Sequence, residues 1–192
     1  MNEVLTRERI LEAAEQVFRR FGPQKTTVVD VARLLGVSHG SVYRHFQSKA
    51  ALRDAVVEGW LRRTSDRLEP IAYSDVQPSL RLRQWFDGLR ATKRKYASSD
   101  PELFSIARAI FSEAPVVISG HVQLLVAQIE KIVADGIAAG EFREADPKST
   151  AQAIFDAMAR FHDPAHALDW NDPENDAAFD RVYALVTAAI AA

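Results

Sequence analysis

The sequence predicts an all-α protein of about nine helices, in which three helices precede a fourth helix and a longer helical remainder. Apolar residues recur at helical spacing through most of the 192 residues, and no segment shows the alternation of a half-buried strand. Glycine and proline fall between these periodic segments, where helices end. The length suits a small module followed by a larger one, each able to bury a core.

The composition excludes several classes of site. Without cysteine the chain forms no disulfide, no thiolate zinc site and no cysteine nucleophile. We expect a soluble cytoplasmic protein with no membrane contact, because no run of about 18 apolar residues and no signal-peptide hydrophobic region is present. Residues 1–65 hold 11 Lys and Arg against 7 Asp and Glu, whereas residues 66–192 hold 13 against 19. This asymmetry suits binding to a polyanion through the N-terminal end, although a difference of this size also arises by chance.

The first two predicted helices follow from their caps and apolar faces. Gly22-Pro23 ends the first helix, because Gly tolerates a left-handed cap and Pro cannot continue the helix. Thr27 is the expected N-cap of the second helix, with Asp30 completing an approximate capping box, and Gly36 ends it. The expected buried residues are Ile10, Ala14, Val17, Phe18 and Phe21 in the first helix and Val28, Val31, Ala32 and Leu35 in the second.

The third predicted helix is shorter than the first two, and the fourth is longer. Ser38 caps a very short third helix that Val42 and Phe46 anchor. Ser48 caps the fourth, which runs towards Pro70 and buries Leu52, Val56 and Trp60 on one side. A polar break at 74–78 follows. We therefore expect a domain at 1–50, a linking helix at about 48–69 and a second domain at 70–192.

Five further helices are expected in the second domain. Pro residues start them and Gly140 stops one of them. A loop or distorted turn from His162 to Pro173 separates the last two helices. The expected ranges are about 79–97, 101–112, 115–139, 147–161 and 175–190.

The segment from Thr26 to Lys49 predicts a helix-turn-helix. The turn Leu35-Gly36-Val37-Ser38 is short enough to make the helices cross steeply, with Gly36 at positive φ and Val37 as an apolar plug. The third helix then buries Val42 and Phe46 and turns its small, polar, aromatic and cationic side chains outwards. That face suits a DNA major groove, which accepts a helix and is read by hydrogen bonds from side chains.

Each residue of this face has a candidate role. Gly40 permits close approach, and His39 and Ser41 reach base edges. Arg44 contacts phosphate or guanine, and Tyr43 pairs its hydroxyl with phosphate. Thr26 and Thr27 at one helix N-terminus and Lys49 at another are candidate phosphate contacts. Two alternatives stay open: Thr27 serves only as a cap, and His45 is a packed helix residue.

Residues 6–65 resemble the DNA-binding module of TetR-family repressors. The matching segments are Ile10-Leu11-Glu12-Ala13-Ala14, Val17-Phe18, Phe21-Gly22, Thr26-Thr27-Val28, Val31-Ala32, Gly36-Val37-Ser38, Gly40-Ser41-Val42-Tyr43-Arg44-His45-Phe46, Ser48-Lys49 and Leu52. The resemblance implies an all-helical homodimer with a three-helix DNA-binding head, a linking fourth helix and a ligand-binding and dimerisation core. The DNA-contact residues it implies are Thr27, Ser38, His39, Gly40, Ser41, Tyr43, His45 and Lys49. Beyond residue 70 we find no such detailed match.

The resemblance also implies a function. We expect a ligand-responsive repressor that binds a pseudo-palindromic operator as a homodimer and is released by a small-molecule effector. An adaptor that binds only protein is the alternative, and the intact outward face of the third helix argues against it. No cofactor is expected.

Aromatic residues of the remainder suggest an effector cavity. They are either plain core or the walls of a cavity for an apolar or aromatic molecule, with a few polar anchors. Arg108 stands beside apolar positions, which suggests either a ligand contact or a salt bridge. The candidate ligand-binding residues are Trp85, Phe86, Phe104, Arg108, Phe111, His121, Gln128 and Phe155.

The last two helices carry a candidate dimer interface. Two such helices from each subunit would form a four-helix contact about a two-fold axis. In the alternative, the same apolar stripes face the core of their own subunit. The candidate interface residues are Ala153, Ala157, Arg160, Phe179, Val182, Tyr183 and Val186.

An enzyme is the remaining alternative. His162 and His166 are four residues apart and have carboxylates nearby, as in some metal sites. Pro164 lies between them, so a regular helix cannot present both on one face. No HExxH motif, GxSxG elbow or phosphate-binding glycine loop occurs. We therefore predict no catalytic activity and no metal.

Overall fold

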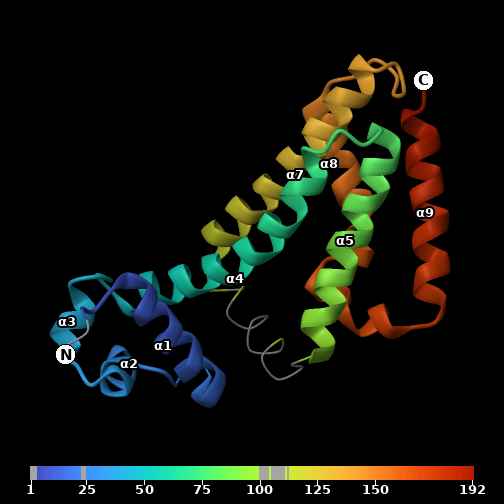
Figure 1. Cartoon of the computed structure of the whole chain (residues 1–192). Coiled ribbons are helices and arrows are strands. Elements are labelled where there is room, and N and C mark those ends of the chain that lie inside the picture. Colours follow the sequence, from blue (N-terminus) through green and yellow to red (C-terminus); the bar gives the residue numbers. More distant parts are fainter. Residues whose placement is uncertain (1–3, 23–24, 100–103, 105–110, 112) are drawn as a thin grey trace. The chain divides into compact units, whose positions relative to one another are not determined.

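The computed structural model describes residues 4–22, 25–99, 104, 111 and 113–192 (Figure 1). They form two compact units, one from the described residues of Met1–Leu61 and Glu102–Ile118, and one from those of Arg62–Pro101 and Ser119–Ala192. Both are helical, as predicted. Within the described ranges, the one β-type pairing is an isolated antiparallel bridge between Phe142 and Ala191.

The first unit contains α1 (Arg7–Phe21), α2 (Val28–Leu35), α3 (His39–Tyr43) and the first half of α4 (Lys49–Ala72). The predicted caps are confirmed. Thr27 Oγ1 accepts from Asp30 N, and the Asp30 side chain accepts from Thr27 N, which completes the capping box. Gly36 ends α2 at φ 68°, in the left-handed region where a residue with a Cβ would be strained.

The core of the first unit matches the predicted apolar faces at most positions. Ile10, Val17, Phe18 and the predicted residues of α2 up to Ala32 are buried, and Val42 and Phe46 hold α3 against them. The prediction that Phe21 is buried is wrong, because this residue is 51% exposed. It ends α1, and the guanidinium of Arg20 lies 5.1 Å from its ring centroid. Leu35, also predicted to be buried, is half-buried at the edge of the cluster.

The second unit contains the rest of α4, then α5 (Pro78–Ser99), most of α7 (Pro115–Ala138), α8 (Pro147–Ala157) and α9 (Glu174–Ile190). Two 3₁₀ helices, η1 (Ala159–Phe161) and η2 (Pro164–Asn171), lie between α8 and α9. The helix predicted at 101–112 lies almost wholly outside the described residues.

The end of α8 corrects the predicted range of 147–161. The α-helix stops at Ala157, Met158 leaves the helical region, and η1 follows as a tighter turn. The backbone N–H groups of Phe161 and His162 bond three residues back, to Met158 O and Ala159 O, which is the pattern of a 3₁₀ helix. The predicted loop from His162 to Pro173 is largely the 3₁₀ helix η2.

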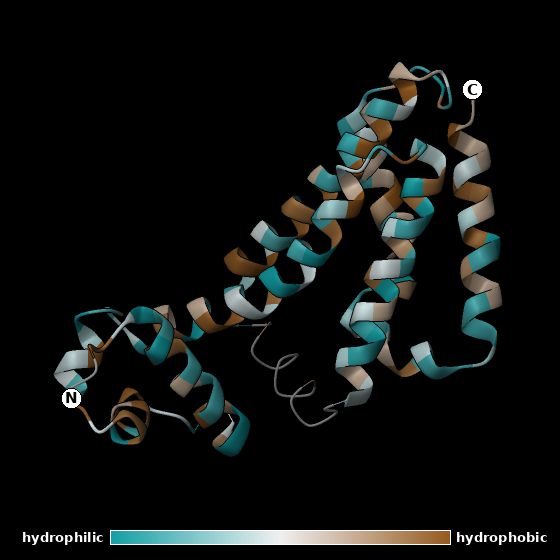
Figure 2. Cartoon of the chain, in the orientation of Figure 1, coloured by the Kyte–Doolittle hydropathy of each residue, from teal (hydrophilic) through white to brown (hydrophobic). Residues whose placement is uncertain are grey.

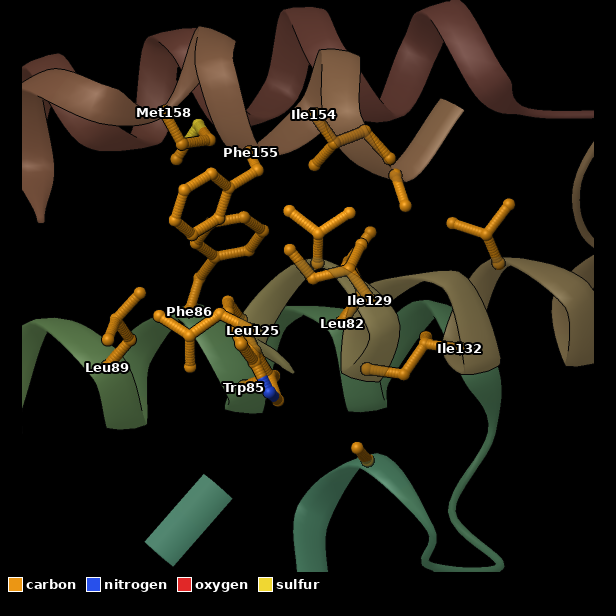
Figure 3. Close-up of a cluster of buried hydrophobic side chains, with 14 of the residues drawn as sticks. Leu82, Trp85, Phe86, Leu89, Leu125, Ile129, Ile132, Ile154, Phe155 and Met158 are labelled. Carbon is orange, nitrogen blue, oxygen red and sulfur yellow. The ribbon is translucent and has the colours of Figure 1, made fainter. Parts of the chain in front are cut away.

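The core of the second unit forms where α5, α7 and α8 meet (Figure 3). Ile154 and Phe155 of α8, and Met158 directly after it, point towards Phe86 of α5 and towards the side chains of α7 (Figure 3). Hydrophobic and hydrophilic bands alternate along α5 and α9, as an amphipathic helix requires (Figure 2). This packing buries one side of each helix.

Helix α7 has the composition of a core helix. It is the one helix in the described part of the chain that is long enough for a membrane span and holds an 18-residue window of sufficient mean hydropathy, 1.4. Leu125, Ile129, Ile132 and Val133 of α7 are buried in the core of the second unit. Burial inside the protein accounts for part of this hydropathy, since 39% of the window is buried.

Ion pairs fasten α9 to α5. Arg83 contacts Asp180 at 2.9 Å, and Arg90 and Arg94 both contact Asp176, at 2.5 and 2.8 Å. The guanidinium of Arg90 also lies 3.7 Å from the ring centroid of Phe179. These pairs fix the packing of α9 against its own subunit.

Candidate nucleic-acid interface and candidate ligand site

Helix α3 presents a polar face that its apolar side chains hold in place. Val42 and Phe46 are buried beneath it. On the outward side, Tyr43 is 44% exposed, and its ring meets that of His39 edge-on at 6.3 Å. The candidate DNA-contact residues exposed on this side are Ser38, His39, Gly40, Tyr43 and Arg44.

Hydrogen bonds order part of this face before any partner binds. Ser38 Oγ accepts from Ser41 N at 3.2 Å and lies 2.9 Å from Ser41 Oγ. Arg44 Nη2 in turn donates to Ser41 Oγ at 3.2 Å. Ser41 is half-buried and hydrogen-bonded to both Ser38 and Arg44. A base contact by Ser41 would compete with these weak surface hydrogen bonds.

The two threonines before α2 differ in their exposure. Thr26 is 2% exposed, and its hydroxyl donates to Gly22 O at 2.7 Å. It ties the end of α1 to the start of α2, so the predicted phosphate contact by Thr26 is wrong. Thr27 is exposed, and its role as a cap is confirmed. The Thr27 hydroxyl donates a hydrogen bond to Asp30 Oδ2 at 2.6 Å, and this bond is the largest cause of the lowered pKa of Asp30.

The remaining head residues extend this surface. Lys49 begins α4 and is exposed, while Ser48 Oγ accepts from Ala51 N at 3.0 Å, as the predicted cap requires. His45 is half-buried. Arg7 of α1 lies 4.4 Å from the ring centroid of Phe46. Sequence reasoning missed this last contact, because the two residues are distant in the chain and neither belongs to a motif.

Most of the predicted cavity residues are core residues in this structure. Trp85 and Phe86 are fully buried, and Phe155 is buried against them. Gln128 accepts from Trp85 Nε1 at 2.9 Å and donates to Ser65 O at 3.1 Å, so its amide is already engaged. Phe111 packs on the core of the first unit, and Arg108 lies outside the described residues. A ligand role for the set remains a prediction.

His121 differs from the other candidates. It is 7% exposed, and neither of its ring nitrogens has a hydrogen-bond partner. Burial and the positive charge of Lys93 lower its pKa to about 3. Lys93 of α5 also acts on His162, whose pKa is about 4, chiefly because the ring is buried. Sequence reasoning identified His121 but missed Lys93, which no motif marks.

The candidate dimer residues divide into two groups. Ala153, Ala157 and Arg160 are exposed on and after α8. Phe179 and Tyr183 are buried in the core of their own subunit, as the alternative reading of the stripe holds, and Val182 and Val186 are half-buried against that core. The exposed side of α9 instead carries Ala184, Leu185 and Ala188.

The two histidines considered for a metal site diverge. His162 is buried and its Nε2 lies 3.1 Å from Phe155 O, whereas His166 is exposed on η2. Among the described residues, no group of three or more His, Asp or Glu side chains is placed to hold a metal ion. The pair offers no shared site.

Two family models match the chain. The model of bacterial regulatory proteins of the tetR family matches residues 10–56, and that of the tetracyclin repressor-like C-terminal domain matches residues 78–183. The chain belongs to the TetR family of transcriptional regulators. The second match corrects the expectation that the part beyond residue 70 has no detailed counterpart.

TetR-family relatives align mainly over the head. HTH-type transcriptional regulator TtgR of Pseudomonas putida is 41% identical over 70 residues, which cover 36% of this chain and 33% of that protein. HTH-type transcriptional repressor KstR2 of Mycobacterium tuberculosis is 36% identical over 80 residues, 42% of this chain and 40% of that protein. The matched region thus spans only a third to two fifths of these relatives.

Solved structures of the family share the whole fold. The regulator FadR from Bacillus subtilis in complex with stearoyl-CoA has a TM-score of 0.67 and 17% identity, covering 96% of this chain and 100% of that chain. The SmeT–triclosan complex, SmeT being a repressor from Stenotrophomonas maltophilia, has a TM-score of 0.68 and 21% identity, covering 97% and 91%. At these identities the likeness shows the TetR fold alone.

Proposed function

We propose that this TetR-family protein is a ligand-responsive repressor that binds a pseudo-palindromic operator as a homodimer and leaves it when a small molecule binds. The observation that carries the proposal is the outward face of α3. It exposes His39, Gly40, Tyr43 and Arg44 while Val42 and Phe46 anchor the helix from below. Membership of a family of DNA-binding regulators makes DNA the expected partner of this face.

On DNA, the side chains of this face divide into two roles. His39, Ser41 and Arg44 face base edges or nearby phosphates, and Gly40 lets the backbone come close. Thr27, Ser38, Tyr43, His45 and Lys49 hold the phosphates on either side. In a dimer, two such helices spaced by about 34–36 Å reach successive major grooves, which accounts for a pseudo-palindromic site.

Dimerisation falls to the exposed sides of α8 and α9. Ala153 and Ala157 leave a small-residue surface on α8, and Leu185 of α9 is 73% exposed. Together with the exposed Ala184 and Ala188, Leu185 forms a contiguous apolar surface on α9, and such surfaces mark contact sites. A four-helix contact of α8 and α9 with their copies would bury them about a two-fold axis.

Each part of the chain then has its own function. Residues 1–50 act as the DNA-binding domain, α4 links it onward from about 48 to 69, and residues 70–192 bind the effector and dimerise. The protein acts in the cytoplasm and carries out no catalysis. KstR2 is itself a repressor, and the stearoyl-CoA and triclosan complexes of FadR and SmeT are consistent with a small-molecule effector.

A fluorescence-anisotropy titration tests the proposal. The purified protein is titrated against labelled DNA from upstream of its own gene, with random-sequence DNA as competitor. We expect saturable binding that survives the competitor and weakens with salt, since phosphate contacts release counterions. Binding to every upstream fragment no tighter than to random DNA would overturn the proposal and favour the adaptor.

Matched variants assign the surface. Tyr43→Ala and Lys49→Ala should each weaken operator binding by about tenfold or more. Tyr73→Ala and Lys148→Ala remove exposed residues of the same types elsewhere and should leave affinity unchanged. Full operator affinity in Tyr43→Ala would show that α3 is not the recognition helix.

A further inference from the structure

The core of the second unit contains a basic group of side chains that its packing does not use. His121 of α7 is more than nine-tenths buried, and both of its ring nitrogens lack a hydrogen-bond partner. A buried polar group left without a partner is costly, so native proteins usually satisfy it with protein, water or ligand. The described part of the core offers His121 none.

Two more nitrogen-bearing side chains lie close enough to this histidine to act on its charge. Lys93 of α5 and His162, which follows η1, both act electrostatically on His121, and each disfavours its protonation. The Lys93 side chain is half-buried and enters no ion pair with a described residue. Burial lowers the pKa of Lys93 to about 8, so at neutral pH most of the ammonium groups remain charged.

Among the described residues, the acidic group that acts on Lys93 is Asp163, which already serves as a helix cap. Asp163 favours the charged form of Lys93, but its Oδ1 accepts from Ala165 N at 2.8 Å as the cap of η2. Asp163 is exposed, so water screens its attraction. Lys93 and His121 therefore present a positive charge and an N–H donor without a matching anion in the described part of the chain.

We propose that Lys93 and His121 bind the carboxylate of an acidic effector. The Lys93 ammonium supplies the charge, and neutral His121 donates one ring N–H to a carboxylate oxygen, in a site dry enough to make both contacts strong. His162 has a supporting role. In its neutral form it donates from Nε2 to Phe155 O at 3.1 Å, which leaves Nδ1 as an acceptor that does not attract an anion.

The surroundings set the rest of the ligand. The ring of Phe155 lies 4.2 Å from that of His162, and Phe161 is buried close by in the chain. An apolar or aromatic body attached to the carboxylate would lie against these rings. The inferred class is therefore a carboxylic acid with an apolar body, and the inference rests on the proposed effector-binding function of this core.

The test compares acids with their amides on the full-length protein. Benzoate, 2-naphthoate, octanoate and decanoate are each paired with the corresponding primary amide, and binding is followed by thermal shift and calorimetry without DNA. We expect at least one acid to bind ten times more tightly than its amide, because the amide keeps the shape but loses the charge. If no acid binds more tightly than its amide, the inference is overturned.

Variants of Lys93 locate the site. Lys93→Met should abolish the preference for the acid, whereas Lys93→Arg, which keeps the charge, should retain it. His121→Phe should reduce the preference. Lys95→Met, which removes an exposed lysine of the same helix, should leave it unchanged. Retention of the full preference in folded Lys93→Met overturns the assignment.

The two proposals fail separately. A protein that binds operator DNA but does not distinguish acids from amides would overturn this inference and leave the repressor function standing. A protein that binds acids through Lys93 but shows no specific DNA binding would overturn the repressor function and leave the acid-binding site standing. If the same acid released operator DNA from the parent protein but not from Lys93→Met, acid binding at Lys93 would be the signal that controls the repressor.

Discussion

Arg53 of α4 holds Glu113, sixty residues later in the chain, by both its side chain and its backbone. Arg53 Nη1 donates to Glu113 Oε2 and Nη2 donates to Glu113 O, each at 2.8 Å. Nε and Nη2 also donate to Asp54 Oδ1. Both ends of this contact belong to the first unit, so the segment just before α7 is tied to the helix that follows α3.

This contact predicts a loss of both stability and effector response. Arg53 is largely buried, so Arg53→Met should lower the free energy of unfolding by about 1–3 kcal/mol, as urea denaturation would measure. If the segment before α7 carries effector binding to α4, the variant should also need more effector to leave DNA in the anisotropy assay.

Glu113→Gln is the milder control. It removes the charge of the carboxylate but keeps the carbonyl that Arg53 Nη2 contacts. It should cost less than half as much unfolding free energy as Arg53→Met. Equal stability of Arg53→Met and the parent protein would mean that the pair contributes nothing measurable, as surface ion pairs often do.

Gly136 of α7 predicts a severe packing defect. A Cβ built at this position overlaps the ring of Phe142, which is itself buried. Gly136→Ala must displace that ring and should destabilise the protein by about 1–3 kcal/mol despite the better helix propensity of Ala. Thermal and urea unfolding measure the effect.

Gly59 supplies the matched control, since it also lies within a helix, α4, but has open space around the added Cβ. Gly59→Ala should be neutral or stabilise the protein by up to about 1 kcal/mol. If both alanine variants behaved alike, the contact between Gly136 and Phe142 would contribute nothing measurable to stability.

The buried histidines predict a loss of stability in mild acid. Burial lowers the pKa of His121 to about 3 and that of His162 to about 4, while in the unfolded chain both return towards 6.5. Between these values the unfolded state binds more protons than the folded state, so stability falls as pH falls. Each histidine should contribute a slope of up to about 1.4 kcal/mol per pH unit between about pH 6 and pH 4.

Urea denaturation at a series of pH values checks this slope. His121→Phe and His162→Phe should each make the profile shallower, because each removes one group that must take up a proton on unfolding. His166→Phe removes an exposed histidine and should leave the slope as it is. A profile that does not respond to either core variant would assign the acid sensitivity to other groups.

Leu185 predicts the dimer contact of α9. Its side chain is exposed between Ala184 and Val186, so a charge there is tolerated by the monomer but would be buried in the proposed interface. Leu185→Glu should shift the protein from dimer to monomer in light scattering coupled to size exclusion. Val116→Glu, an equally exposed apolar position on α7, should remain dimeric. A dimeric Leu185→Glu would exclude this face of α9.

Much of the helical order follows from short-range chemistry. The Thr27–Asp30 capping box and the positive φ of Gly36 involve residues a few positions apart, so the pattern of letters is enough to predict them. The same holds for the anchoring of α3 by Val42 and Phe46. Phe21 shows the limit, because periodicity alone does not reveal that the core ends one turn before the helix does.

The contacts that carry the proposals join residues far apart in the chain. The sequence by itself determined the helical fold, its caps and the outward face of α3, because neighbouring residues decide each of these. Only the tertiary structure decided that Thr26 is buried, that Arg53 holds Glu113, and that Lys93 acts on His121. Burial and electrostatic environment depend on how whole helices pack, and no local pattern encodes which distant side chains that packing brings together.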